Sequence, residues 1–165
     1  MSKQISLTRG LFTIIDDEDF EWLNQWKWYA HKAKTGFYVY RSFTYKSENK
    51  IIKKNIAMHR LLMNIIDSND ICDHIDGNPL NNQKYNLRKC TKQQNNYNHK
   101  NHRKNKTSKY LGVCFFPESS KWRATICKAG KVQHIGLYYT EEEAAKAYDN
   151  LAKELHGEFA SLNFG

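Results

Sequence analysis

A basic run near the middle of the sequence sets the strongest limit on how this chain can fold. Residues 97–109 read YNHKNHRKNKTSK and hold five lysines and arginines, two histidines and no acid. The run has no hydrophobic period, which is typical of an extended, solvated linker. A chain of 165 residues has room for one ordinary domain or for two small ones in tandem, and a run of this kind separates folded segments.

The composition favours a folded protein that binds a polyanion. Apolar residues make up 40% of the chain and aromatic residues 13%, while 26 Lys and Arg face 17 Asp and Glu, a net charge of +9. A folded protein this basic usually binds a polyanion such as a nucleic acid.

Other classes of protein are not favoured. The N-terminus lacks the apolar core of a signal peptide, and no run of about 18 apolar residues occurs, so we expect no membrane partner. None of the four cysteines forms a C-x-x-C pair, so no zinc knuckle is expected. A reduced, cytoplasmic compartment fits this cysteine usage best.

Residues 1–57 are expected to form a β-rich region with one short helix. The segment IDDEDFEWLNQW supplies Asp16 or Asp17 as the N-cap of that helix. The stretch GFYVYRSFTY, residues 36–45, alternates along its length and predicts a twisted antiparallel ribbon. Its aromatic side chains are able to stack on nucleotides, but a small sheet core explains them better.

Residues 58–98 show the order helix, strand, long loop, strand, helix. MHRLLMNII predicts a short helix, ICDHID a strand, GNPLNNQKY a loop and NLRKC a second strand. A further helix is predicted to begin at Thr91, which has the T-x-x-Q spacing of a capping box with Gln94.

The polar stretch DHIDGNPLNNQKYNLR, residues 73–88, carries groups that phosphodiester hydrolysis needs. A histidine near its free pKa deprotonates the attacking water, and a hard divalent cation held by oxygen ligands stabilises the charge on the phosphoryl and leaving oxygens. Asp73 and His74 are adjacent, so both serve one site only if the strand ends or bends there. The Gly77-Asn78-Pro79 turn just beyond provides for this.

Two asparagines complete the predicted site. Asn86 is expected opposite His74, where its side-chain oxygen accepts a hydrogen bond from one ring nitrogen and fixes the tautomer. Asn95 is expected to reach back from the following helix as a second oxygen ligand beside Asp73. Asn96 is the alternative, because adjacent helical positions differ by about 100°. One carboxylate and one amide suit a single Mg²⁺ or Mn²⁺ ion better than zinc.

Residues 73–88, preceded by MHRLLM and followed by TKQQNN, resemble the HNH homing-endonuclease motif over about forty residues. The resemblance implies a ββα-metal nuclease module. By position it implies the metal ligands Asp73 and Asn95, the general base His74 and the orienting residue Asn86.

Three basic residues near this motif have open roles. His59 is either a second catalytic or phosphate-binding histidine, or a helix residue that packs beside the site. Arg60 is a candidate phosphate clamp. Arg88 either clamps a phosphate or pairs with an acid such as Asp76.

The C-terminal part predicts three short strands, with turns at PESS and KAGK, followed by a helix that begins with a Thr140–Glu143 capping box. Its segments SKYLGV, KWRATI, HIGLYYTEEEAAKAYDNLA and ASLNF resemble the Apetala/ethylene-response-factor DNA-binding domain over about 57 residues. The resemblance implies a three-stranded sheet that is backed by one helix and enters the major groove. Leu111 and His134 stand where plant members usually have arginine and tryptophan, so their base preference is not transferable.

The predicted DNA contacts lie on the outward face of that sheet and in the linker. Trp122, Ala124 and Ile126 are expected to face the helix, with the alternate residues of the strand facing outward. The candidates for base or phosphate contacts are Arg123, Thr125 and His134. The candidates for phosphate contacts alone are Lys121, Lys128, Lys131, Lys100, Arg103, Lys104 and Lys106.

The predicted fold class is α+β. We expect a β-rich region at 1–57, a ββα-metal HNH module at 58–98, a basic linker at 99–107 and an Apetala/ERF-like DNA-binding domain at 108–165.

The predicted function is site-specific, homing-type cutting of double-stranded DNA by a metal-dependent endonuclease. We expect a monomer or homodimer with one Mg²⁺ or Mn²⁺ per site and no small-molecule cofactor, in a bacterial cytoplasm and encoded by a phage or mobile element. One alternative is a DNA-binding regulator with an inactive HNH fold, and another is a non-catalytic RNA-binding or structural protein. The complete set of site residues favours the nuclease.

Overall fold

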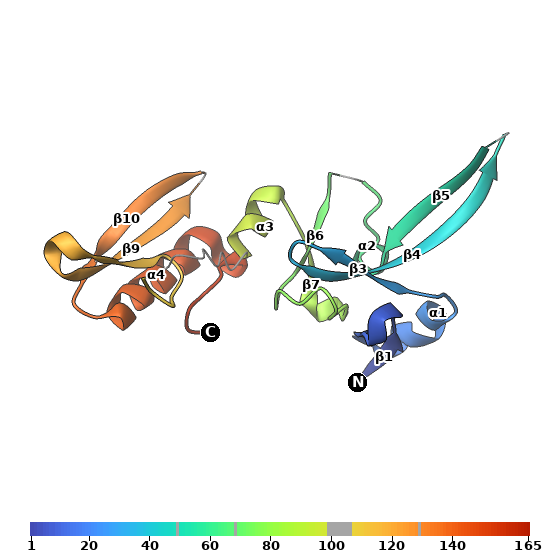
Figure 1. The fold of residues 1–165 in the computed structure, drawn as a ribbon, viewed down its shortest axis with the longest axis horizontal. Helices are drawn as coiled ribbons and strands as arrows, with labels where there is room; N and C mark the ends of the chain where they lie inside the picture. The colour runs from blue at the N-terminus through green and yellow to red at the C-terminus, as the bar shows by residue number, and fades with distance from the viewer. Residues whose placement is uncertain (49, 68, 99–106, 129) are drawn as a thin grey trace. The chain divides into compact units, whose positions relative to one another are not determined.

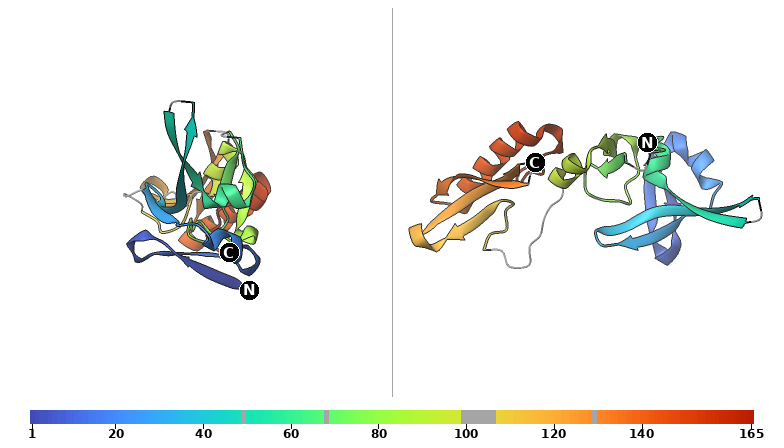
Figure 2. Two further views of the ribbon diagram at one scale, coloured as in Figure 1. Left: turned by 90° about the vertical axis from the view of Figure 1, so that its right-hand side faces the viewer. Right: turned by 90° about the horizontal axis from the view of Figure 1, so that it is seen from above.

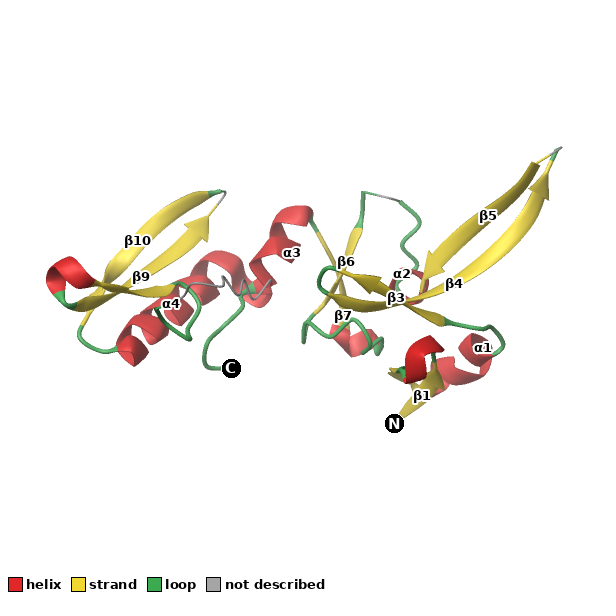
Figure 3. Ribbon diagram, in the orientation of Figure 1, coloured by secondary structure: helices red, strands yellow, loops and turns green. Residues whose placement is uncertain are grey.

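The structure is a computed structural model that describes residues 1–48, 50–67, 69–98, 107–128 and 130–165. The chain divides into two compact units, Met1–Thr91 and Lys92–Gly165. Each unit mixes helices with antiparallel sheet, so the predicted α+β class is confirmed (Figures 1 and 3). Among the described residues, no helix is long and apolar enough to cross a membrane.

The first unit begins with two small sheets and a short helix. These elements are β1 (Ser2–Ser6), β2 (Phe12–Asp16), α1 (Phe20–Asn24), β3 (Tyr29–Ala33), β4 (Gly36–Ser47) and β5 (Lys50–Ala57). Strands β1 and β2 form one antiparallel hairpin, and β3-β4-β5 form a second antiparallel sheet. The core that joins them consists of Ile5, Leu7, Ile15, Leu23, Trp28, Ala30, Val39 and Met58.

Two local expectations for this region need correction. The helix begins at Phe20, after a 3-10 turn over Asp17–Asp19, so neither predicted residue is its N-cap. The Asp19 carboxylate instead accepts a hydrogen bond from Trp22 Nε1 (3.1 Å). The aromatic side chains of GFYVYRSFTY were expected to form a sheet core. Phe37, at the start of β4, does pack against the core, but Phe43 and Tyr45 are 36% and 38% exposed.

The predicted helix, strand, loop and strand follow as α2 (Met58–Leu62), β6 (Ile71–His74) and β7 (Leu87–Cys90). The long loop between β6 and β7 is hydrogen-bonded to β2. The Ile14 N–H donates to Leu80 O (2.9 Å), and the Asn82 N–H donates to Ile14 O (2.8 Å). The N-terminal hairpin is therefore part of the same unit as the motif, whereas we expected a boundary at residues 57 and 58.

The second unit contains α3 (Lys92–Asn98), β8 (Val113–Phe116), β9 (Lys121–Lys128), β10 (Lys131–Tyr138) and α4 (Glu141–His156). The sheet order is β10-β9-β8, and α4 lies along one face of this sheet (Figure 2). Three alanines of α4 are fully buried, namely Ala144, Ala145 and Ala152. Their small side chains let the helix approach the sheet closely. The predicted three-stranded sheet on one helix is thus observed, and so is the predicted capping box.

The C-terminal residues close this second unit. Asn163 donates from its backbone and side-chain nitrogens to the buried carboxylate of Asp149 (2.9 and 3.0 Å), and its Oδ1 accepts from the Leu111 N–H (2.6 Å). The neighbouring Gly112 has φ +70°, and a Cβ there would lie 2.2 Å from Tyr148 Cδ2. Only glycine therefore fits at this position.

Candidate active site

The carboxylate of Asp73 is buried and ion-paired. Asp73 is 7% exposed, and it lies directly opposite Arg88 in the β6–β7 register. Arg88 donates from Nε and a terminal nitrogen to Asp73 Oδ2 (3.0 and 2.8 Å). Of the two roles considered for Arg88, the structure shows ion pairing, but with Asp73 rather than with Asp76. The reason is the register, which places the two side chains on the same face of the hairpin.

His74, the next residue of β6, carries a buried imidazole. It is 5% exposed, and burial lowers the pKa of His74 below the usual histidine value. A hydrogen bond that His74 makes to Asn82 Oδ1 and the charges of Asp76 and Asp73 oppose that shift. Burial of the ring thus favours the neutral imidazole, which is the form that is able to accept a proton.

Asn82 lies beside His74 in a fixed orientation. It is 1% exposed, and its Oδ1 is 3.5 Å from His74 Nε2. Its Nδ2 donates to Thr13 Oγ1 (2.9 Å) and to Pro79 O (3.2 Å). The Thr13 hydroxyl in turn donates to Leu80 O (2.8 Å), so its oxygen is the acceptor for Asn82. Since Pro79 O only accepts, the amide nitrogen of Asn82 points away from His74 and the amide oxygen points toward it.

Asn86, which we expected in that place, braces the turn instead. Its Oδ1 accepts from the Asp76 N–H (3.0 Å), and its Nδ2 donates to Asp76 Oδ1 (2.9 Å) and Asn81 O (2.8 Å). The difference arises because His74 pairs with Leu87, while Asn86 ends a 3-10 turn one residue earlier. The described hydrogen bonds thus assign the acceptor beside His74 to Asn82.

His59 and Tyr38 surround the imidazole of His74. The ring centroids of His59 and His74 are 5.3 Å apart. The ring centroid of Tyr38 lies 5.9 Å from that of His59 and 6.2 Å from that of His74. Burial, together with the charges of His74 and Arg60, lowers the pKa of His59 to about 3. Within the described residues, His59 Nδ1 is buried without a hydrogen-bond partner. This placement fits a neutral histidine that packs beside the site.

Arg60 is engaged with the loop before β6. Its two terminal nitrogens donate to Asp70 O (2.7 Å) and to Asp67 O. The guanidinium of Arg60 therefore connects α2 to that loop by hydrogen bonds. A contact between Arg60 and a DNA phosphate stays a prediction.

The two predicted metal ligands, Asp73 and Asn95, both offer oxygen atoms. Across the described ranges, no group of three or more His, Cys, Asp and Glu residues is placed to hold a metal ion. Asp73 offers one carboxylate, and the second predicted ligand, Asn95, lies half-buried on α3 in the second unit. Its alternative, Asn96, is exposed.

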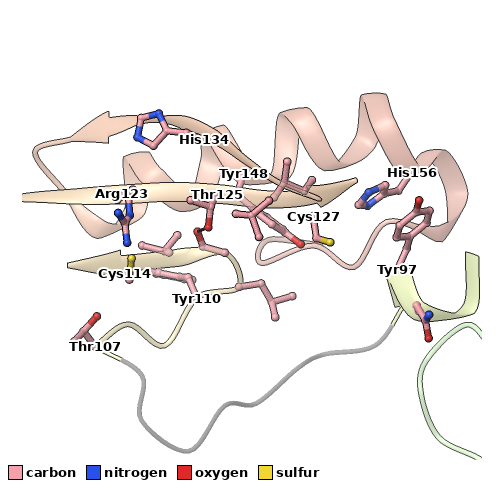
Figure 4. A pocket seen from close by; sticks show the side chains of 16 residues that line it. Tyr97, Thr107, Tyr110, Cys114, Arg123, Thr125, Cys127, His134, Tyr148 and His156 are labelled. Atoms are coloured by element: carbon pink, nitrogen blue, oxygen red, sulfur yellow. Dashed lines mark hydrogen bonds between the residues drawn. The ribbon is translucent and has the colours of Figure 1, made fainter. Parts of the chain in front are cut away.

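Three of the predicted DNA-contacting residues of the second unit line one pocket. Arg123, Thr125 and His134 line this pocket of about 640 Å³ together with Tyr97 of α3 and His156 of α4 (Figure 4). The Tyr97 and His156 rings stack with centroids 3.7 Å apart.

Two residues of this pocket have contacts of their own. The Arg123 guanidinium lies 4.8 Å from the Phe116 ring centroid. Thr125 Oγ1 donates to Gly112 O at 3.4 Å.

The predicted split of β9 into inward and outward residues holds for its centre. Ala124 and Ile126 are buried, and Trp122 packs on the same core. Of the predicted phosphate contacts, Lys128 and Lys131 are exposed. Lys121 lies over the Tyr139 ring at 4.4 Å. Four further candidates lie outside the described residues, namely Lys100, Arg103, Lys104 and Lys106.

Comparison with known proteins identifies the class of protein to which this chain belongs. A family model described as HNH endonuclease matches residues 65–97. An uncharacterized HNH endonuclease, L560, of Acanthamoeba polyphaga mimivirus is 32% identical over 160 residues, covering 94% of this chain and 76% of the relative. Protein 3.8 of Escherichia phage T7 is 33% identical over 117 residues, covering 71% of this chain and 95% of the relative. The chain therefore belongs to the HNH endonuclease family and is a nuclease.

The C-terminal part has separate relatives. The AP2-like ethylene-responsive transcription factor TOE2 of Arabidopsis thaliana is 36% identical over 61 residues, which cover 37% of this chain and 13% of that protein. The match is short, so what it implies about DNA binding is taken up as a proposal.

Proposed function

We propose that this protein is a metal-dependent, site-specific DNA endonuclease that uses His74 as the general base. The observation that carries the proposal is the buried imidazole of His74, which follows Asp73 in β6 and faces an amide oxygen of fixed orientation. A neutral histidine held in this way is suited to take a proton from water.

The hydrogen bonds of Asn82 decide which ring nitrogen takes that proton. Asn82 Oδ1 only accepts, so His74 Nε2 carries the hydrogen in the neutral ring. His74 Nδ1 is then the atom that receives the proton of the attacking water. Asn82 keeps the ring in this tautomer and stabilises the imidazolium that forms.

The Asp73 carboxylate would hold one hard divalent cation, Mg²⁺ or Mn²⁺, and DNA phosphate oxygens and water would provide further ligands. Asn95, which lies on α3 of the second unit, stays the second ligand that the sequence predicts. Bound at Asp73, such an ion supplies charge stabilisation at the phosphoryl oxygens and at the leaving 3′-oxygen. Arg88 donates from two nitrogens to Oδ2 of Asp73 and so orients the carboxylate.

The second unit supplies affinity and choice of site in this proposal. Its three-stranded sheet and its similarity to plant transcription factors support an Apetala/ERF-like DNA-binding domain. The exposed Lys128 and Lys131 would contact phosphates, and Arg123, Thr125 and His134 would contact bases or phosphates. The viral relatives support a phage or mobile-element origin. The homing-type role is proposed from the resemblance of residues 73–88 to the HNH homing-endonuclease motif.

A plasmid assay tests the proposal. Supercoiled DNA is expected to be nicked by the wild-type chain with Mg²⁺, spared with EDTA, and spared by His74→Ala. The exposed His31→Ala is the matched control and is expected to cut like the wild type. If the wild type binds DNA but leaves it intact with every divalent ion, the chain is instead a DNA-binding regulator with an inactive site.

A further inference from the structure

Strands β4 and β5 continue well beyond the sheet that they share with β3. Within the described residues, β3 pairs with β4 only from Gly36 to Tyr40. Past the Tyr40–Ala57 pair, β4 and β5 stay paired for seven further positions, up to Ser47–Lys50 (Figure 1). We name residues 41–47 and 50–56 the β4–β5 arm. Seven steps of about 3.3 Å make the arm roughly 23 Å long.

Core packing does not explain the arm. None of its residues belongs to the buried core of the first unit, and nearly all are partly or fully exposed. A two-stranded ribbon without a second layer is only marginally stable in water. A feature of this length therefore suggests a partner that orders it.

The chemistry of the arm points to a polyanion. Residues 41–57 contain one acid, Glu48, and the five basic residues Arg41, Lys46, Lys50, Lys53 and Lys54. Lysines on an edge strand also discourage aggregation. Protection against aggregation explains the lysines but not the stacked, partly exposed Phe43 and Tyr45, whose ring centroids are 5.9 Å apart.

The two faces of the arm differ. Arg41, Phe43, Tyr45 and Lys54 share one face, where the Arg41 guanidinium lies 3.8 Å from the Trp26 ring centroid and Lys54 Nζ lies 5.5 Å from that of Tyr45.

The opposite face is polar apart from Ile51, which pairs with Lys46 and is exposed. Ser42 donates to Asn55 Oδ1 (2.7 Å), and Thr44, Lys46 and Lys53 continue the row. A two-stranded ribbon fits the major groove, which is about 12 Å wide, and such a polar row offers donors to phosphates and base edges.

The foot of the arm lies at the candidate active site. Tyr38, two residues before the Tyr40–Ala57 pair, is 6.2 Å from His74 between ring centroids. Strand β5 leads directly into α2, whose His59 is 5.3 Å from His74. A duplex whose phosphate lies at His74 therefore passes the foot of the arm. At about 3.4 Å per base pair, an arm of roughly 23 Å reaches some seven base pairs along it.

We propose that the β4–β5 arm is a DNA-binding element that enters the major groove of duplex DNA within about seven base pairs of the cut. Lys46, Lys53 and Lys54 neutralise backbone phosphates along the groove. The proposal rests on the proposed function only in taking the cleaved duplex as the ligand.

Binding without cleavage tests the arm. The affinity of the full chain for a 40-base-pair duplex is measured in EDTA over a range of KCl concentrations. The arm variant carries Lys46→Gln, Lys53→Gln and Lys54→Gln. The control carries Lys27→Gln, Lys146→Gln and Lys153→Gln, three exposed lysines outside the arm. Each lost phosphate contact makes the slope of log K against log salt shallower by about 0.9. The slope of the arm variant, which lacks three such contacts, is therefore expected to be shallower by about 2.7. The same variant is expected to bind the duplex at least about tenfold more weakly at 0.1 M salt.

The outcomes separate this proposal from the proposed function. A larger loss of slope in the arm variant than in the control supports the arm, whereas equal losses, or no loss in either, overturn it. A second variant replaces residues 44–53 by Asn-Gly, joining the paired Phe43 and Lys54 through a two-residue turn. It should bind as weakly as the arm variant and keep the thermal stability of the wild type. A wild-type chain that binds DNA but never nicks it leaves the arm proposal standing and refutes the nuclease mechanism.

Discussion

The position of Asn82 gives the sharpest prediction about the chemistry. Asn82→Ala removes an amide that is 1% exposed and that bonds Thr13 Oγ1 (2.9 Å), Pro79 O (3.2 Å) and His74 Nε2 (3.5 Å). At about 1 kcal/mol for each good hydrogen bond and less for the longest, the free energy of unfolding is expected to fall by about 2–3 kcal/mol. Because His74 also loses its orienting acceptor, the nicking rate should fall by roughly 10- to 100-fold.

A matched control separates orientation from stability. Thr13→Val removes the fully buried hydroxyl that bonds Asn82 and Leu80 O, and it is expected to cost about 1–3 kcal/mol. The remaining bond from Asn82 Nδ2 to Pro79 O (3.2 Å) still turns the amide oxygen toward His74, so the nicking rate should stay within about threefold of the wild type when both are measured well below their unfolding temperatures.

Single-turnover nicking of bound plasmid, together with urea unfolding, measures both quantities for the two variants. Equal rate losses in Asn82→Ala and Thr13→Val, or an unchanged rate in Asn82→Ala, would refute the role of Asn82 as the orienting residue.

Three further outcomes follow from the structure. Arg88→Ala leaves the Asp73 carboxylate buried without its ion pair and should lower the free energy of unfolding by about 3–5 kcal/mol, and adding Asp73→Asn should recover part of the loss in the same urea titration. The pKa of His59 is about 3 in the folded chain and near 6.5 in the unfolded chain, so the free energy of unfolding should fall as the pH drops below 6.5. His59→Gln should reduce the slope of unfolding free energy against pH by about 1.4 kcal/mol per pH unit between pH 6 and 4. An unchanged slope would contradict the burial of His59. Gly112→Ala forces a Cβ to within 2.2 Å of Tyr148 at φ +70° and should cost about 2 kcal/mol or more by thermal denaturation, so a wild-type melting temperature would count against this packing.

Local signals predicted the elements that depend on neighbouring residues. The Thr140–Glu143 capping box marked the start of α4, and the alternation of β9 placed Ala124 and Ile126 against it, because these patterns act within a few residues. The turn residues after His74 likewise predicted a strand that ends there.

Contacts between distant segments were not predictable in the same way. Thr13 lies 69 residues before Asn82, and no local pattern links the two. The pairing of Arg88 with Asp73 follows from the register of β6 and β7, which one sequence does not specify. The asparagines of the GNPLNN loop did indicate a polar loop, but only the packing of that loop on β2 selects Asn82 as the neighbour of His74.

The point along β4 at which the sheet core ends was also not predictable from the sequence. Val39 is buried while Phe43 and Tyr45 are exposed, although all three belong to one alternating stretch. Alternation shows which residues share a face, whereas a second packing layer decides whether that face is buried.

The central claim is that the imidazole of His74 takes the proton of the attacking water. The most direct measurement is the single-turnover rate at which wild type and His74→Ala nick plasmid DNA with Mg²⁺, at equal occupancy of the DNA. The account predicts a rate roughly 10²- to 10⁴-fold lower for His74→Ala, with DNA affinity unchanged. A variant that cuts at the wild-type rate while equally bound would contradict it.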